Sequence, residues 1–207
     1  DMATLNLNNN AGANYTYTQG TGSATSFSGD YQISTPGCYP TLASFITALN
    51  AGTIAGPVNC FVSAGYTETA PAGGYSITAT GTSANPITFV KFGAGTNPTL
   101  TAGVGTSTTT DAIFKIIGGD YITIDGFSLL EAGTNVTATT QVEWGIALLH
   151  ASVTNGCQNN TIQNNTITLN KTNLNTFGIY SNNNHSATAV GTTESVTNST
   201  TGPASGN

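Results

Sequence analysis

Two stretches of the chain decide the fold: Tyr121-Ile-Thr-Ile-Asp-Gly-Phe-Ser-Leu and Asn159-Asn-Thr-Ile-Gln-Asn-Asn-Thr-Ile. The second repeats the first at an offset of 38 residues. That offset aligns three pairs: Thr123 with Thr161, Ile124 with Ile162, and Leu129 with Ile167. Each unit is a short strand, a polar turn and a second short strand, and such a unit cannot bury its apolar residues until another stacks on it. The repeat therefore predicts stacked coils.

The repeat extends further along the chain at a different offset. Trp144-Gly-Ile-Ala is followed by Phe177-Gly-Ile-Tyr, 33 residues later. Unequal offsets on one pattern are typical of a solenoid whose coils are joined by loops of variable length. We expect isoleucines to fill the interior. Asparagine at the tight turns tolerates left-handed backbone and can bond to asparagine in the neighbouring coil.

The rest of the chain consists of short β-runs separated by Gly, Asn, Pro and Ser. Strands are expected near both ends of the first 18 residues and, after one helix, in eight runs: 58–62, 75–79, 86–92, 112–117, 121–130, 144–149, 160–169 and 177–180. The helix is predicted over residues 41–51. Leu42, Phe45, Ile46 and Leu49 have the i, i+3, i+4, i+7 spacing of one apolar face, Thr41 can cap the start, and Gly52 can end it.

The composition excludes several functions. The 207 residues contain 3 Lys and no Arg against 9 Asp+Glu, for a net charge of −6. A nucleic-acid partner is therefore not expected, because no basic surface can form. Thr and Asn make up about 30% of the chain and replace charge as the source of solubility. No run of 18 apolar residues predicts a membrane span.

At this point the chain resembles the right-handed parallel β-helix of the pectin-lyase-like superfamily. The order of 39–50, Gly56-Pro-Val, Ala64-Gly-Tyr-Thr-Glu-Thr and 81–89 is similar to the opening of large secreted β-helix proteins of Bacteroidota. The resemblance covers roughly residues 31–185. It implies an all-β solenoid whose short helix caps the N-terminal end, and export by the type IX secretion machinery to the outside of the cell.

Three regions are expected from these patterns. Residues 1–35 form polar strands, residues 36–185 form the coils with their capping helix, and residues 186–207 form a segment rich in Ser, Thr and Gly. Nothing in the last segment is typical of a C-terminal cap. We therefore expect further C-terminal coils, or a partner chain, to cover an open solenoid end.

Catalytic residues are sparse. Polysaccharide lyases of this fold use a basic residue, commonly with calcium, so the candidate bases are Lys91 and Lys115, although an outward lysine often only solubilises a strand. Asp120 and Asp125 are the best carboxylate pair for a glycosidase. In one extended strand they would lie about 17 Å apart on opposite faces, which favours a role in turns. We expect no catalytic residue, no metal site and no cofactor, since calcium has no evident carboxylate cluster.

One loop offers a candidate binding site. Glu131, Glu143 and Trp144 lie in or beside the long loop 131–143, where an aromatic ring beside carboxylates could bind a sugar. The alternative is a tryptophan packed in the coil interior. His150 and His185 are isolated, which favours placement in the core or at the surface.

Three cysteines allow at most one internal disulfide, and their spacing fits no zinc motif. We predict a bond between Cys38 and Cys60, with free thiols as the alternative, and leave Cys157 unassigned. An extracellular location would preserve such a bond.

These observations predict a non-enzymatic, secreted or cell-surface β-helix domain that binds a polysaccharide or cell-surface glycan, as an adhesin would, within a larger exported protein. The competing hypothesis is a polysaccharide lyase or glycoside hydrolase with its active site mostly beyond residue 207. The many threonines suggest a third, an ice-binding solenoid. No regular Thr-x-Thr ladder at coil spacing is evident in the sequence to support it.

Overall fold

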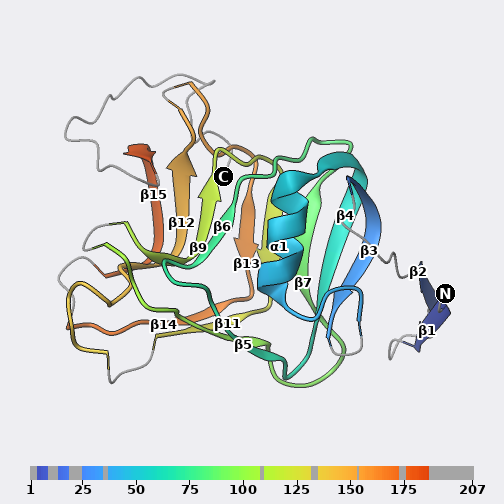
Figure 1. Ribbon diagram of the computed structural model, residues 1–207, viewed down its shortest axis with the longest axis horizontal. Coiled ribbons are helices and arrows are strands. Elements are labelled where there is room, and N and C mark those ends of the chain that lie inside the picture. Colours follow the sequence, from blue (N-terminus) through green and yellow to red (C-terminus); the bar gives the residue numbers. More distant parts are fainter. Residues whose placement is uncertain are drawn as a thin grey trace.

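The computed structural model shows a parallel β-solenoid of about four turns (Figure 1). It describes residues 4–8, 14–18, 25–34, 37–107, 110–131, 135–152, 154–172 and 176–186. In these residues three parallel sheets form the sides of the solenoid. Four coils contribute one strand to each side, and one further strand precedes them in the first sheet. The prediction of an all-β solenoid with one short helix is confirmed.

The first sheet has the strand order β13-β10-β7-β4-β3. Its strands are β3 (Ser26–Ile33), β4 (Thr53–Ser63), β7 (Ile87–Phe92), β10 (Ile122–Asp125) and β13 (Thr161–Gln163). The second sheet has the order β14-β11-β8-β5, with β5 (Thr67–Thr69), β8 (Thr99–Thr101), β11 (Ser128–Leu130) and β14 (Thr166–Thr168). The third has the order β15-β12-β9-β6, with β6 (Tyr75–Ile77), β9 (Ala112–Ile117), β12 (Trp144–His150) and β15 (Phe177–Ser186).

The register predicted from the sequence repeat is confirmed. Ile124 pairs with Ile162, and Leu129 pairs with Ile167. Trp144 likewise pairs with Phe177. Two strands of the second sheet, β5 and β8, were not predicted, because each has only three residues and neither shows a run of apolar side chains. The predicted strands over 121–130 and 160–169 each bend at a polar corner into two.

Asparagines shape these corners, as expected. Asn159 and Asn164 have left-handed backbone, with φ of 56° and 55°. The next residues bond to the preceding coil. The Asn160 side chain accepts from the N–H of Ile122 at 2.9 Å, and the Asn165 side chain accepts from the N–H of Phe127 at 2.8 Å. The expected pairing between asparagines is therefore replaced by bonds from amide to backbone, which satisfy buried N–H groups at each corner.

Inward side chains from all three sheets form one hydrophobic core. Its largest fully buried members include Phe27, Phe45, Phe89, Phe114 and Phe127. Several of these rings meet at an edge, as Phe45 and Phe89 do at a centroid distance of 6.0 Å. The coils are thus held together by stacked apolar side chains as well as by backbone ladders.

The helix α1 (Leu42–Ala51) lies against β3, β4 and β6, at the end of the solenoid where the chain enters the coils (Figure 1). The predicted capping by Thr41 is confirmed. The Thr41 side chain accepts from the N–H of Ser44 at 3.1 Å, and Gly52 is the C-cap. The predicted apolar face is also confirmed, because Leu42, Phe45, Ile46 and Leu49 are the buried residues.

Two polar side chains attach α1 to the edge of the first coil. Glu68, in an inward position of β5, accepts from the N–H groups of Leu42 at 2.7 Å and Ala43 at 3.1 Å. A carboxylate at this place satisfies otherwise unpaired donors and favours the helix dipole. At the other end Asn50 donates to the carbonyl of Ser76 at 2.7 Å and accepts from the N–H of Thr78 at 2.9 Å. The helix therefore covers strand edges that would otherwise be open.

The first residues of the chain form an antiparallel hairpin of β1 (Thr4–Asn8) and β2 (Asn14–Thr18), which confirms the two strands predicted there. The described coils run to Ser186. The predicted segment 186–207 lies, apart from that residue, outside the described part of the chain. In the described residues no helix has the length and apolar character needed to cross a membrane.

Candidate functional surface

The outer face of the second sheet carries two columns of hydroxyl-bearing side chains. In β8 the central Leu100 is fully buried, so Thr99 and Thr101 point outward on either side of it. The parallel register aligns these two threonines with the corresponding positions of the other three strands. We call this surface the hydroxyl face: Thr67, Thr99, Ser128 and Thr166 in one column, and Thr69, Thr101, Leu130 and Thr168 in the other.

Seven of these eight positions carry a hydroxyl. None of the seven hydroxyls has a side-chain hydrogen bond within the described residues. Threonine hydroxyls elsewhere accept hydrogen bonds from backbone N–H groups of the protein. Thr41 caps the helix, for example, and Thr80 accepts from the N–H of Asp120 at 3.1 Å. The hydroxyls of the face are therefore free to bond outside the molecule. The sequence shows no regular Thr-x-Thr ladder because loops of unequal length separate the rows, yet the fold aligns three Thr-x-Thr rows and one Ser-x-Leu row.

The predicted sugar-binding residues are all buried. Trp144 is 2% exposed, Glu143 is 0% exposed and Glu131 is 3% exposed. The Trp144 ring stacks on Tyr180, with centroids 4.1 Å apart and planes 3° from parallel. It packs with Ala112, Ala147 and Leu149 in a small apolar cluster on the third sheet, separate from the main core. In this arrangement the ring offers no open platform to a sugar.

The two glutamates hold loops in place. Glu131 accepts from the N–H of Val142 at 2.9 Å and from the N–H of Asn170 at 3.0 Å, so it joins two consecutive coils. Glu143 accepts from the N–H of Asp111 at 3.0 Å. Buried carboxylates that accept backbone N–H groups stabilise the loops around them. The structure thus gives both side chains a structural task in the place where the sequence suggested a ligand.

A third buried carboxylate and a buried lysine lie close by. Asp111 is 1% exposed and accepts from the N–H groups of Thr106 and Ser107, each at 2.7 Å. Lys115, a candidate lyase base, is 9% exposed. Burial lowers the pKa of Lys115, while the charge of Asp111 opposes this change. Lys115 therefore does not present its amine to a groove on the surface.

The other candidate catalytic side chains form hydrogen bonds within loops and corners. Lys91 donates to the side chain of Asn97 at 3.3 Å. Asp120 accepts from the N–H of Gln158 at 2.7 Å, and burial raises the pKa of its carboxyl group. Asp125 accepts from the side chains of Gln163 and Asn164 in the next coil. The two aspartates belong to separate corners, as the turn interpretation predicts.

The predicted disulfide is absent. Cys38, Cys60 and Cys157 are all free thiols. Cys60 points inward from β4 and is fully buried between Val58 and Val62, where a thiol packs as a small apolar group. Burial raises the pKa of Cys60 well above its ordinary value and that of Cys157 to about 11.

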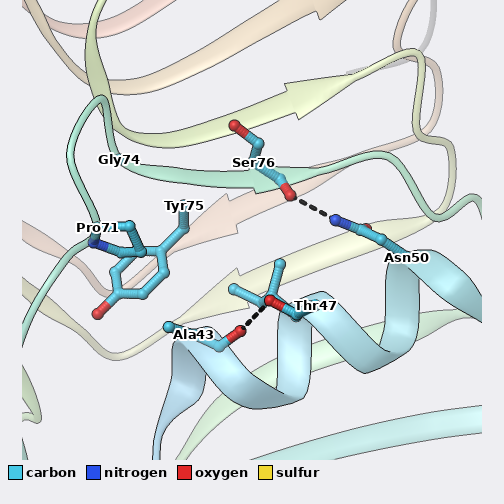
Figure 2. A pocket seen from close by; sticks show the side chains of 8 residues that line it. Ala43, Thr47, Asn50, Pro71, Gly74, Tyr75 and Ser76 are labelled. Atoms are coloured by element: carbon cyan, nitrogen blue, oxygen red, sulfur yellow. Dashed lines mark hydrogen bonds between the residues drawn. The ribbon is translucent and has the colours of Figure 1, made fainter. Parts of the chain in front are cut away.

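A groove of about 300 Å³ lies between α1 and β6. Figure 2 shows Asn50 reaching from the helix to Ser76 along one side of it. Its lining combines four apolar residues, Ala43, Ile46, Pro71 and Gly74, with four polar ones, Thr47, Asn50, Tyr75 and Ser76. The lining contains no charged side chain.

No three His, Cys, Asp or Glu side chains of the described residues gather where they could hold a metal ion. His150 lies at the end of β12, half-buried, and the side chain of His185 lies outside the described part of the structure. Comparisons with protein families, curated proteins and solved structures found no match.

Proposed function

We propose that this chain is a non-enzymatic adhesion module that binds carbohydrate through the hydroxyl face. The observation that carries the proposal is the pair of in-register columns with seven hydroxyls free of partners in the described residues. A glycan chain laid along the columns would meet a new row of hydroxyls about every 4.8 Å. Each exchange of a water bond for a protein bond contributes only about 1 kcal/mol, so adhesion would come from many contacts acting together.

The positions of the candidate catalytic side chains favour a binding function over an enzymatic one. Lys115 is buried, and Asp120 and Asp125 hold different corners. The competing lyase or hydrolase, with its active site mostly beyond residue 207, would need groups other than these. A functional surface made of threonines needs no shifted pKa and no charge, in agreement with a chain in which 6% of residues are charged.

A retention assay on insoluble polysaccharides tests the proposal. The full chain is mixed with cellulose, chitin or insoluble pectin, and the bound fraction is measured. We expect wild-type retention on at least one polymer and at least tenfold weaker binding by the double variant Thr99→Ala/Thr101→Ala. The matched control is Thr88→Ala/Thr123→Ala on the outer face of the first sheet, which should bind within twofold of wild type. No retention on any polymer, or equal losses in both variants, would contradict the proposal.

The same incubations test catalysis. Soluble uronate polymers are added, and unsaturated products are followed by ultraviolet absorbance. A non-enzymatic module gives no product. Product formation that Lys115→Ala abolishes would replace adhesion with lyase activity as the function.

The proposal includes a secreted or cell-surface location with export by the type IX route, supported by the resemblance of residues 31–185 to exported β-helix proteins. It also includes a further coil, from this chain or a partner, stacked on β13, β14 and β15. The exposure of Phe177 (50%) and Ile179 (51%) on the last of these strands supports that contact. Fractionation of the native host should recover the protein outside the cell or on its surface, and recovery in the cytoplasm would contradict this part.

A further inference from the structure

We infer that the hydroxyl face binds ice. The inference concerns the same surface as the proposed function, but it does not require that the surface bind a polysaccharide. It starts from the regular two-dimensional spacing of the columns. Neighbouring strands place hydroxyls about 4.8 Å apart along a column, and residues two apart in a strand place the columns about 6.7 Å from each other. Both repeats are close to those of the oxygen atoms on a prism face of hexagonal ice.

Register in both directions distinguishes this face from an ordinary polar surface. Thr67 and Thr69 of β5, Thr99 and Thr101 of β8, and Thr166 and Thr168 of β14 are three Thr-x-Thr rows. The row of β11 has Ser128 and Leu130 in the same places. On the first sheet one column contains Thr88, Thr123 and Thr161, but its neighbour holds Val90, Asp125 and Gln163. Among the described strands only the second sheet repeats hydroxyls in both directions.

The chemistry of the side chains fits a solid water surface. A threonine presents a hydroxyl that can join the water lattice and a methyl group that excludes mobile water. No charged side chain points outward from the four strands, because Glu68 faces inward and bonds to α1. A charge would hold a tight hydration shell that does not match ice. Leu130 interrupts one column but adds no charge, and it is 38% exposed.

Because the fold is rigid, the weak contacts of single hydroxyls with ice can add up to a useful binding free energy. Each hydroxyl contributes little alone, and a flexible surface would lose the gain in ordering its side chains. Here the ladders of the second sheet and the inward column of buried Leu100, buried Leu129 and half-buried Ile167 fix the strands. Threonine is stiff at χ1, so little rotamer freedom remains to be lost on contact. The array is organised before it meets the ice surface.

Partition of the 207-residue chain into slowly growing ice tests the inference. The fraction of protein in the ice is compared with the fraction in the remaining liquid, and thermal hysteresis is recorded on single crystals. Wild type should be enriched in ice, and Thr99→Tyr/Thr101→Tyr should lower the enrichment at least tenfold. Thr88→Tyr/Thr123→Tyr, the matched control on the first sheet, should stay within twofold of wild type. Far-ultraviolet circular dichroism establishes that each variant is folded.

A gain-of-function variant keeps the test decisive if a tyrosine variant unfolds. Leu130→Thr completes the second column and should raise thermal hysteresis, by about twofold or more, with no loss of stability. Exclusion of wild type from ice, or equal enrichment of both folded tyrosine variants, would overturn the inference. Retention on polysaccharide without enrichment in ice would support the proposed function and contradict the ice inference. Enrichment in ice without retention on polysaccharide would support the ice inference and contradict the proposed function.

Discussion

The second and third sheets are built from the same coils, yet their outer faces have opposite chemistry. On the third sheet the outward side chains Trp144, Ala147 and Leu149 are buried with the inward ones, so β9 and β12 are nearly inaccessible on both sides. On the second sheet every outward position is at least partly exposed, and seven of eight carry hydroxyls. A solenoid shares one core among its sides, so each outer face can be specified independently. Of the two outer faces, that of the second sheet is therefore exposed and uncharged, whereas that of the third sheet is buried.

The largest expected effect contrasts the two outer faces directly. Trp144→Ala removes a buried ring and should lower the free energy of unfolding by about 3–5 kcal/mol. Thr101→Ala, at an outward position of β8, should change it by less than about 0.5 kcal/mol. Urea denaturation of both variants measures the difference. Similar losses in the two would show that the faces are not distinct.

A smaller effect is expected where a loop crosses between coils. Glu131→Ala leaves the N–H groups of Val142 and Asn170 without their acceptor, which should cost about 1–3 kcal/mol. Glu131→Gln keeps one acceptor oxygen and should cost less. At temperatures where both variants are folded, neither should change retention on polysaccharide. A loss of binding without a loss of stability would restore Glu131 as a ligand residue.

The burial of Lys115 on the third sheet predicts that stability depends on pH. Burial lowers its pKa in the folded state below the ordinary value of 10.5, so the unfolded chain binds the proton more tightly. The charged lysine therefore costs stability at neutral pH, and this cost disappears as pH rises through the folded pKa toward 10.5. Lys115→Met should be at least as stable as wild type at pH 7, with an advantage that shrinks as pH rises. An advantage that grows with pH would contradict this account, and Thr101→Ala serves as the control.

The reactivity of the three thiols reports how accessible the interior of the solenoid is. This measurement needs no substitution and therefore does not alter stability. Three thiols should react with a disulfide reagent in urea without reductant, whereas the disulfide predicted from the sequence would leave one. In the native protein at pH 8, the half-buried Cys38 should react first. Cys60 and Cys157 should be slow, because burial raises both pKa values and keeps the thiols protonated. Rapid native reaction of all three would mean that the core is open.

The contrast between the two sheets also explains what the sequence could predict. The third sheet was foreseen because β9 and β12 are long apolar runs, and the register of Trp144 on Phe177 follows from a visible repeat. In the second sheet, strand β5 could not be recognised as a strand from its sequence Thr-Glu-Thr. Its inward position holds a carboxylate where an apolar side chain is expected, because Glu68 accepts hydrogen bonds from the helix there. Only the fold shows that this strand lies beside β8, because the loops between the rows differ in length.

The burial of the predicted sugar-binding residues has a related cause. An aromatic ring beside carboxylates in a loop can form a sugar-binding site, but Glu131 and Glu143 accept backbone N–H groups across coils. Which N–H group a carboxylate accepts is a property of the stacked coils and not of the local sequence. The Asn159 and Asn164 corners were predictable because left-handed backbone is a local preference of asparagine.

The central claim is that the fold aligns the two columns of the hydroxyl face, and a crosslinking measurement tests it most directly. In a background with Cys38→Ser, Cys60→Ala and Cys157→Ala, cysteine pairs are introduced across β8 and β11 and then oxidised. Thr101→Cys/Leu130→Cys joins register partners, whose Cα atoms should lie within the range that a disulfide spans. Thr101→Cys/Ser128→Cys is out of register. We predict efficient crosslinking of the first pair and little of the second, whereas equal yields, or the reverse order, would contradict the account.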